Sequence, residues 1–277
     1  MALTIAHPSI VPIFRSLVRK RVIDLPALCV GTIVPDLGEW TNRAALSDRA
    51  HSWSGMVTTV LPLGIVLLFL YHLLRRPLFF TFPNPHRQYF SDSRALNRLP
   101  LYPGAFASVL VGILLGSCCH LLWDSVTEAN GHFVYSFHAF RKVYGLPAWA
   151  PLQGTISTFL LLNLATSSLG ILFALFAYRS WCQSRRVLLP HPYAARDFDR
   201  WRWYFWSVGL LVSTAQGIPS ALPLLGRDPD IYRFSLFWHH WGTSFLASLV
   251  SFATIGSLIV YFAWGLKSRR PPPLDKR

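Results

Sequence analysis

Five stretches of this chain are apolar over about the 20 residues that a helix needs to cross a bilayer. They are residues 55–74, 105–123, 155–178, 203–225 and 243–266. Hydrophobic residues make up 52% of the chain and charged residues only 14%, whereas a soluble domain has about 25% charged residues. We therefore predict an all-α fold, a polytopic membrane bundle with five transmembrane helices, in which residues 1–266 form a single integral membrane domain.

The residues before the first span are apolar in shorter pieces. Residues 8–17 and 24–37 lie on either side of a basic stretch that ends at Arg21, and at about 1.5 Å per residue neither piece crosses alone. Backbone at membrane depth has to be buried in protein when it is irregular. We predict that the two pieces form a short helical hairpin packed against the spans, and that residues 267–277 are a disordered cytoplasmic tail.

The charge of the chain lies mostly between the apolar stretches. There are 26 basic and 12 acidic residues, a net charge of +14, and this placement suits anionic lipid headgroups better than a nucleic acid. We expect membrane lipids as partners and no nucleic acid. Segments 75–104, 179–202 and 267–277 contain five, six and five Lys and Arg residues, whereas 125–154 and 226–242 contain two each. The three basic segments are therefore predicted to be cytoplasmic.

His120 and Asp124 are the most informative polar residues, at the end of the second apolar stretch. A spacing of four places both side chains on one face of a helix, close enough to bind one ion or each other. Ionisable groups in a span are costly and indicate a functional site by default. A structural hydrogen bond that fixes the helix end is the alternative, and the pair alone does not decide between the two.

Three further ligand-type residues lie at membrane boundaries on the same predicted side: His7, Asp36 and His51. With His120 and Asp124 they would form a site of imidazoles and carboxylates, which suits zinc, manganese or iron rather than calcium. We expect a divalent metal there, with zinc or manganese favoured. Each residue also has a simpler interpretation, since Asp36 can cap a helix and the histidines can lie at the interface.

The segments around these residues resemble a known family. Ala6-His7-Pro8, Val34-Pro35-Asp36, Ala50-His51-Ser52 and the run from His120 to Thr127 resemble an uncharacterised bacterial integral-membrane family, which is similar to the YdjM-like inner-membrane proteins labelled metal-dependent hydrolases. The resemblance spans roughly the first two thirds of the chain. It implies that His7, Asp36, His51, His120 and Asp124 are metal ligands and that the protein lies in a bacterial inner membrane.

The chain also departs from those hydrolases. They follow the Pro-Asp pair with a second acid and a histidine, where this chain has Leu37, Gly38 and Glu39, and they place another histidine shortly before the position of His51. A two-metal centre is therefore not expected. Glu39 and Asp48 are the candidates for a substitute ligand or a general base.

Two functions from different classes fit these features. The leading hypothesis is a membrane-embedded metal-dependent hydrolase that acts on a lipid or lipid-linked ester or phosphoester at the external interface. The alternative is a non-enzymatic membrane protein, either a metal or proton transporter or a scaffold. Transporters often contain paired broken helices, and the stretch from Gln216 to Pro223 is the only such break in a long span.

Overall fold

The computed structural model describes residues 4–91, 93–97, 100, 103–146, 154–188, 200–226 and 230–268. Five helical segments within these ranges are long and apolar enough to cross a membrane, and they are Trp53–Thr81, Ala105–Ser136, Thr158–Arg185, Arg200–Leu225 and Ile231–Ala263. Each predicted stretch lies almost entirely within one of them. The prediction of an all-α polytopic bundle is confirmed.

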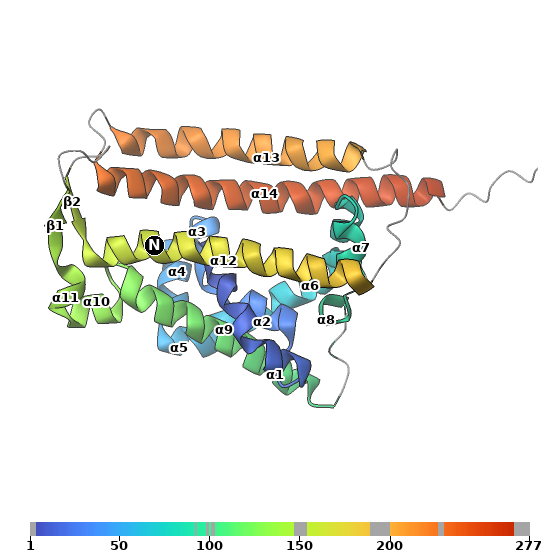
Figure 1. Ribbon diagram of the computed structural model, residues 1–277, viewed down its shortest axis with the longest axis horizontal. Helices are drawn as coiled ribbons and strands as arrows, with labels where there is room; N and C mark the ends of the chain where they lie inside the picture. The colour runs from blue at the N-terminus through green and yellow to red at the C-terminus, as the bar shows by residue number, and fades with distance from the viewer. Residues whose placement is uncertain are drawn as a thin grey trace, which may run out of the picture.

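The five segments are built from long helices with shorter helices at their ends (Figure 1). In chain order the elements are α5 (Trp53–Gly55), η3 (Met56–Val60) and α6 (Leu61–Thr81); α9 (Ala105–Thr127), α10 (His132–Ser136) and α11 (His138–Arg141); α12 (Thr158–Leu188); α13 (Arg200–Ala221) and η5 (Leu222–Leu225); and α14 (Ile231–Ser268).

The connections define two ends of the bundle (Figure 1). One end, which we call the basic end, contains α7 (His86–Ser91) and α8 (Arg94–Asn97). The other, the hairpin end, contains α10, α11 and an antiparallel strand pair, β1 (Val143–Gly145) and β2 (Thr155–Ser157), in which Tyr144 is paired with Ile156. The positive-inside rule predicts that the basic end is cytoplasmic.

The first 36 residues contain the predicted helical hairpin. It comprises η1 (Thr4–Phe14), α1 (Arg15–Arg19), α2 (Leu25–Gly31) and η2 (Val34–Asp36). Asp24 caps α2 by accepting a hydrogen bond from the Ala27 amide at 3.0 Å, and its own amide donates to the Ser108 carbonyl at 3.3 Å. The turn of the hairpin therefore lies beside the first turn of α9, so the basic stretch that ends at Arg21 faces the basic end.

Close helix contact in the core depends on glycines. A Cβ atom on Gly31 would lie 2.3 Å from the Ile113 carbonyl oxygen, and one on Gly116 would lie 2.4 Å from the Leu28 carbonyl oxygen. Small residues of this kind let two helix backbones approach closely inside a membrane. The return arm of the hairpin, α2, is consequently held directly against α9, which carries His120 and Asp124.

The last two spans, α13 and α14, lie side by side as a separate layer (Figure 1). Polar contacts near the basic end join this layer to α6. The Arg202 Nε donates to the Phe80 carbonyl at 2.9 Å and the Trp206 Nε1 donates to the Thr81 carbonyl at 3.1 Å. Thr81 also contacts Ser257 of α14, with 3.1 Å between the hydroxyl oxygens.

The ends of several elements differ from the sequence prediction. Residues 155–157 form β2, so the third span begins at Thr158. The fourth helix continues through Pro219 and ends at Ala221. The fifth begins at Ile231 rather than at residue 243 and continues to Ser268, while residues 269–277 of the predicted tail lie outside the described residues.

The early start of α14 has a packing reason. Residues 232–241 are aromatic and polar, which lowers their hydropathy, yet Trp241 lies against Gly217 of α13, where an added Cβ would be 2.9 Å from the indole Cδ1. His239 and His240, which precede the predicted fifth span, are therefore helical residues of α14.

Candidate metal site

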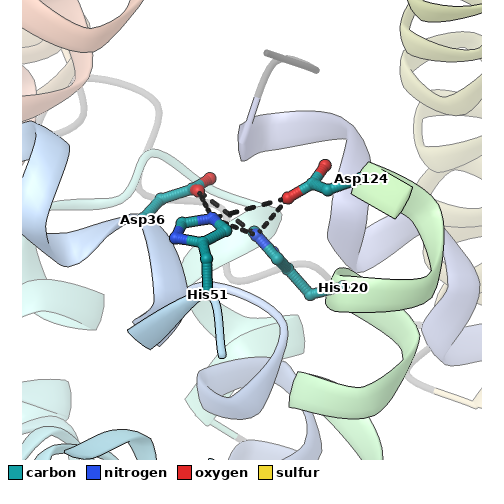
Figure 2. A group of neighbouring side chains, drawn as sticks. All are labelled: Asp36, His51, His120 and Asp124. Carbon is teal, nitrogen blue, oxygen red and sulfur yellow. Dashed lines mark hydrogen bonds and ion pairs between the residues drawn. The ribbon is translucent and has the colours of Figure 1, made fainter. Parts of the chain in front are cut away.

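Four polar side chains from three parts of the chain, two of them on α9, meet near the hairpin end of that helix (Figure 2). Each offers one atom, and the four atoms lie within 4.8 Å of one another. We call this group the Asp–His cluster, and its members are Asp36, His51, His120 and Asp124. The structure thus brings together four of the five ligands predicted from the sequence.

The spacing of these atoms suits a small divalent ion. The His120 Nε2 is 2.8 Å from Asp124 Oδ2 and 3.2 Å from Asp36 Oδ1. The His51 Nε2 is 3.4 Å from Asp36 Oδ1, 3.5 Å from Asp124 Oδ2 and 3.4 Å from His120 Nε2. Ligands at about 2.0–2.1 Å from a tetrahedral zinc ion are about 3.3–3.4 Å apart. The cluster therefore has nearly the ligand spacing of a zinc site.

Backbone carbonyls hold both imidazoles in the orientation that a metal requires. The Nδ1 of His120 lies 2.9 Å from the Thr32 carbonyl oxygen, and the Nδ1 of His51 lies 2.9 Å from the Ser47 carbonyl oxygen. A carbonyl only accepts hydrogen bonds, so each Nδ1 carries a proton and donates it. The Nε2 lone pairs then face the cluster, and this is the usual arrangement around metal-bound histidines.

The local fold explains why these residues meet. Asp36 ends η2, directly before α3 (Leu37–Trp40), and His51 follows the last residue of α4 (Ala44–Ala50). A Cβ on Gly38 would lie 2.3 Å from the Ser47 backbone nitrogen, so only a glycine permits this approach of α3 and α4. The approach places the Ser47 carbonyl, and with it the ring of His51, beside Asp36.

Charge is the main energetic problem of the cluster. Asp36 is 4% exposed and Asp124 is 5% exposed, so two carboxylates lie together away from water. Burying charges is costly unless they are paired or bind a metal. Burial alone would raise the pKa of Asp36, but the adjacent imidazoles, led by His120, hold it well below its usual range. A divalent ion, or protonation of both histidines, would balance the two negative charges.

The protonation state of His51 depends on this charge. Burial opposes its protonation, but hydrogen bonds to Asp124 and Asp36 outweigh burial and raise the pKa of His51 to about 10. In the metal-free protein His51 is therefore protonated at neutral pH. A metal ion would have to displace that proton, because a metal-bound imidazole nitrogen must be deprotonated.

His7, the fifth predicted ligand, lies against the cluster but outside the group of four. Its ring stacks on that of His120 with 3.9 Å between centroids, and its Nε2 is 3.6 Å from Asp124 Oδ1, the oxygen that faces away from the other histidines. Burial, and then repulsion by His120, lower the pKa of His7 to about 4. His7 is thus a neutral neighbour of Asp124 at physiological pH.

A cavity of about 490 Å³ adjoins the cluster, and His51 and Asp124 form part of its wall. The remaining lining residues are Ser47, Asp48, Trp53, Leu121, Ser125, Glu128, Asn130, Gly131, His132 and Tyr135. A Cβ on Gly131 would lie 2.6 Å from the Asp124 carbonyl oxygen, so the chain after α9 turns back tightly against the last turn of that helix. This turn places His132 and Tyr135 at the cavity.

The two candidates for a general base differ in position. Asp48 lines the cavity. Glu39 is outside the lining, and its Oε2 lies 3.6 Å from the Nε2 of His239 on α14. Burial, and then the charge of Asp36, raise the pKa of Glu39 to about 8.

Two cavity residues had received little weight in the sequence. Glu128 had not been singled out, although His120, Asp124, Glu128 and His132 follow one another at intervals of four residues. His132, which lies beyond the predicted second span, is exposed at the start of α10 and lines the cavity. The spacing of four from Asp124 was a signal for Glu128, which directly follows α9, whereas a turn separates His132 from that helix.

Comparison with known proteins places the chain in a family. It belongs to the family described as "Domain of unknown function (DUF4184)", whose model matches residues 1–266. No curated protein and no solved structure matches the chain. An uncharacterised family, as the sequence motifs suggested, is therefore shown, and the function has to be argued from the site.

Proposed function

We propose that this protein is a membrane-embedded, metal-dependent hydrolase of lipid or lipid-linked esters or phosphoesters. One observation carries the proposal: a buried group of two carboxylates and two imidazoles, at the ligand spacing of a divalent ion, forms part of the wall of a cavity. Asp36, His51, His120 and Asp124 would hold the ion. Zinc and manganese both accept this set of nitrogen and oxygen ligands.

When bound, a divalent ion polarises a phosphoryl or carbonyl oxygen and lowers the pKa of water. The protein supplies the remaining functions. The carbonyls of Thr32 and Ser47 fix the two imidazoles, and Asp48 in the cavity wall accepts the proton of the attacking water. The water oxygen bonds to phosphorus or to the acyl carbon, the ester bond breaks, and the leaving oxygen takes up that proton.

The position of the cavity supports a lipid substrate. Trp53 and Tyr135 line it and are 61% and 77% exposed, and both lie near the ends of membrane-spanning segments. Exposed Trp and Tyr at such positions are typical of the headgroup level of a bilayer. The distribution of Lys and Arg favours the external side for this end. The resemblance of the His and Asp motifs to the YdjM-like hydrolases further supports hydrolysis and a bacterial inner membrane.

A second function is favoured by one specific feature of the cluster. Four protein atoms lie within 4.8 Å of one another, so all four could bind one ion. Zinc with four protein ligands is typical of structural sites, whereas catalytic zinc keeps one position for water or substrate. Under this alternative the ion fastens the N-terminal hairpin to α9 or is itself transported. The cavity beside His51 and Asp124 favours the hydrolase, because a structural ion needs no access.

Metal analysis combined with an ester assay tests the proposal. Zinc-loaded and manganese-loaded protein in detergent would be given bis(para-nitrophenyl) phosphate and a para-nitrophenyl acyl ester. We expect hydrolysis by the wild type, loss of metal and activity in His120→Ala, and retained metal without activity in Asp48→Asn. His138→Ala, altered outside the cavity, is the control. Stoichiometric metal without hydrolysis of either ester would favour the structural site.

A further inference from the structure

The cavity has two walls, and each of them has acidic and aromatic side chains. One wall comes from α4 and α5 and contains Asp48, His51 and Trp53. The other comes from α9, the turn after it and α10, and its lining includes Asp124, Glu128 and Tyr135. Glu128 follows Asp124 by four residues and so extends the same face of the helix toward the hairpin end.

The lining is strongly acidic. Three carboxylates line the cavity, Asp48, Asp124 and Glu128, and among the described residues no Lys or Arg lines it. A divalent ion in the Asp–His cluster would balance Asp36 and Asp124. The charge of Asp48 would remain, and a cationic group placed beside Glu128 would favour the charged form of that carboxyl, so the loaded cavity would attract a cation.

This attraction for cations favours some lipid headgroups over others according to their charge. A lipid whose headgroup carries only negative charge would be repelled by the acidic walls, since like charges at close range cost free energy in a partly desolvated site. A headgroup with an ammonium group beside its phosphodiester carries both signs. Its phosphate can face the cluster while its ammonium faces a carboxylate.

An independent feature also indicates a ligand at this position. Asp124 is 95% buried, and apart from the imidazoles of the cluster neither of its carboxylate oxygens has a hydrogen-bond partner within the described part of the chain. Asp124 also lines the cavity, so a group that binds at the Asp–His cluster is reached from the cavity. Tyr135 adds an aromatic ring to the same wall, and aromatic faces attract ammonium groups.

We propose that the cavity binds a zwitterionic phospholipid headgroup, with its ammonium group against Glu128 and Tyr135 and its phosphodiester toward the Asp–His cluster. The inference rests on the proposed function, because it names the substrate class of the same cavity. The acyl chains would lie toward Trp53 and the bilayer. Glu128 is then a specificity-determining residue.

Lipid binding to the full chain tests this assignment separately from turnover. Zinc-loaded protein in detergent would be titrated with palmitoyl-oleoyl phosphatidylethanolamine or the matched phosphatidylglycerol, and bound lipid counted by native mass spectrometry. We expect preference for phosphatidylethanolamine by several-fold to about tenfold, since one partly exposed ion pair is worth up to about 1 kcal/mol and a cation–aromatic contact adds to it. Equal binding, or preference for phosphatidylglycerol, would overturn the proposal even if esters are hydrolysed.

Variants at Glu128 show whether this side chain sets the preference. Glu128→Gln should remove most of the preference and Glu128→Lys should reverse it toward phosphatidylglycerol, a gain of binding that an unfolded protein cannot show. Asp230→Asn is the matched control, because this carboxylate lies near β2 at the same end but outside the cavity lining. A preference that survives both Glu128 variants contradicts the assignment.

A soluble competitor distinguishes a lipid from a free headgroup. Glycerophosphoethanolamine carries the same charged groups without acyl chains. We expect it to compete at least tenfold more weakly than the lipid, because it buries no apolar surface at the cavity mouth. Competition as strong as that of the lipid would overturn the lipid assignment and identify a water-soluble phosphodiester instead.

Discussion

The Nδ1 atom of His120 lies 2.9 Å from the carbonyl oxygen of Thr32, a residue 88 positions earlier in the chain. This hydrogen bond joins α9 to the end of α2 and fixes the ring so that Nε2 faces Asp36 and Asp124. Because the Thr32 carbonyl depends on the close contact of α2 with α9, the chemistry of the Asp–His cluster depends on the packing of the N-terminal hairpin.

Removal of a cluster member should remove the metal. We expect His120→Ala or Asp124→Ala to lose most bound zinc or manganese, since each would lose a direct bond to the ion. Element analysis of detergent-purified protein measures this. His138→Ala and His240→Ala, which alter histidines outside the cluster, should retain the wild-type content. Equal metal in all four variants would return the His120–Asp124 pair to a structural role.

The contact between α2 and α9 can be tested without touching a ligand. In Gly116→Ala the new methyl group would meet the Leu28 carbonyl, at 2.4 Å in the present backbone. Overpacking of this kind costs about 1–3 kcal/mol, so the protein should unfold at lower temperature and bind zinc more weakly as Thr32 moves from His120. In the control, Gly145→Ala, the methyl group meets nothing within 4 Å. Unchanged zinc affinity in Gly116→Ala would contradict the coupling.

Metal binding should release a proton at neutral pH. The pKa of His51 is about 10 in the metal-free protein, whereas that of His7 is about 4, so only His51 of these two is protonated at pH 7. Because the proton of His51 is displaced, zinc affinity should rise at least about tenfold per pH unit from pH 7 toward pH 10. Calorimetry in buffers of different ionisation enthalpy measures the released proton. Affinity that is flat over this range would show that His51 is not a ligand.

The same raised pKa affects the stability of the metal-free protein. The pKa of His51 is higher in the folded state than the ordinary value of 6.5, so its protonation stabilises the fold. The contribution is complete below pH 6.5 and is lost as the pH rises toward about 10. Thermal unfolding of metal-free protein should therefore show a decline over this window that is weaker in His51→Ala. A decline of equal size in both proteins would assign it to another group.

Much of the fold follows from the sequence because hydropathy reports burial in lipid directly. The five spans and the N-terminal hairpin were predicted, the hairpin because its two apolar pieces are too short to cross the membrane alone. The start of α14 at Ile231 was missed, because hydropathy does not record the contacts that stabilise these turns. The Asp230 carboxylate accepts a hydrogen bond from the Arg233 amide at 2.7 Å, and Trp241 packs on Gly217. The β1–β2 pair was also missed, because each strand has only three residues and so is too short to show an alternating pattern.

The site was predictable in its residues but not in its geometry. The spacing of four indicated His120 and Asp124, and the membrane-boundary positions and family motifs indicated Asp36, His51 and His7. These signals did not show that His7 lies outside the group of four. The anchoring carbonyls of Thr32 and Ser47 have no sequence signal, because every residue has a carbonyl. Glu128 had a signal, the spacing of four from Asp124, but its place in the cavity depends on the tight turn at Gly131.

The last prediction concerns His7, which the motifs suggest as a ligand and the structure places against His120. Its ring stacks on His120 at 3.9 Å and its Nε2 is 3.6 Å from the outer oxygen of Asp124. A residue that supports a ligand in this way typically changes metal affinity by roughly 10- to 100-fold when it is removed. We therefore expect His7→Ala to weaken zinc binding by that factor and still to bind one ion.

His7→Phe separates the two contacts of this side chain. Phenylalanine keeps a flat ring that can stack on His120 but has no nitrogen for Asp124, so its zinc affinity should fall between those of the wild type and His7→Ala. Competition with a chromophoric zinc chelator measures all three constants. Complete loss of zinc in both variants, as expected for His120→Ala, would instead make His7 a direct ligand, and Asp124 would then bind through the oxygen that faces it.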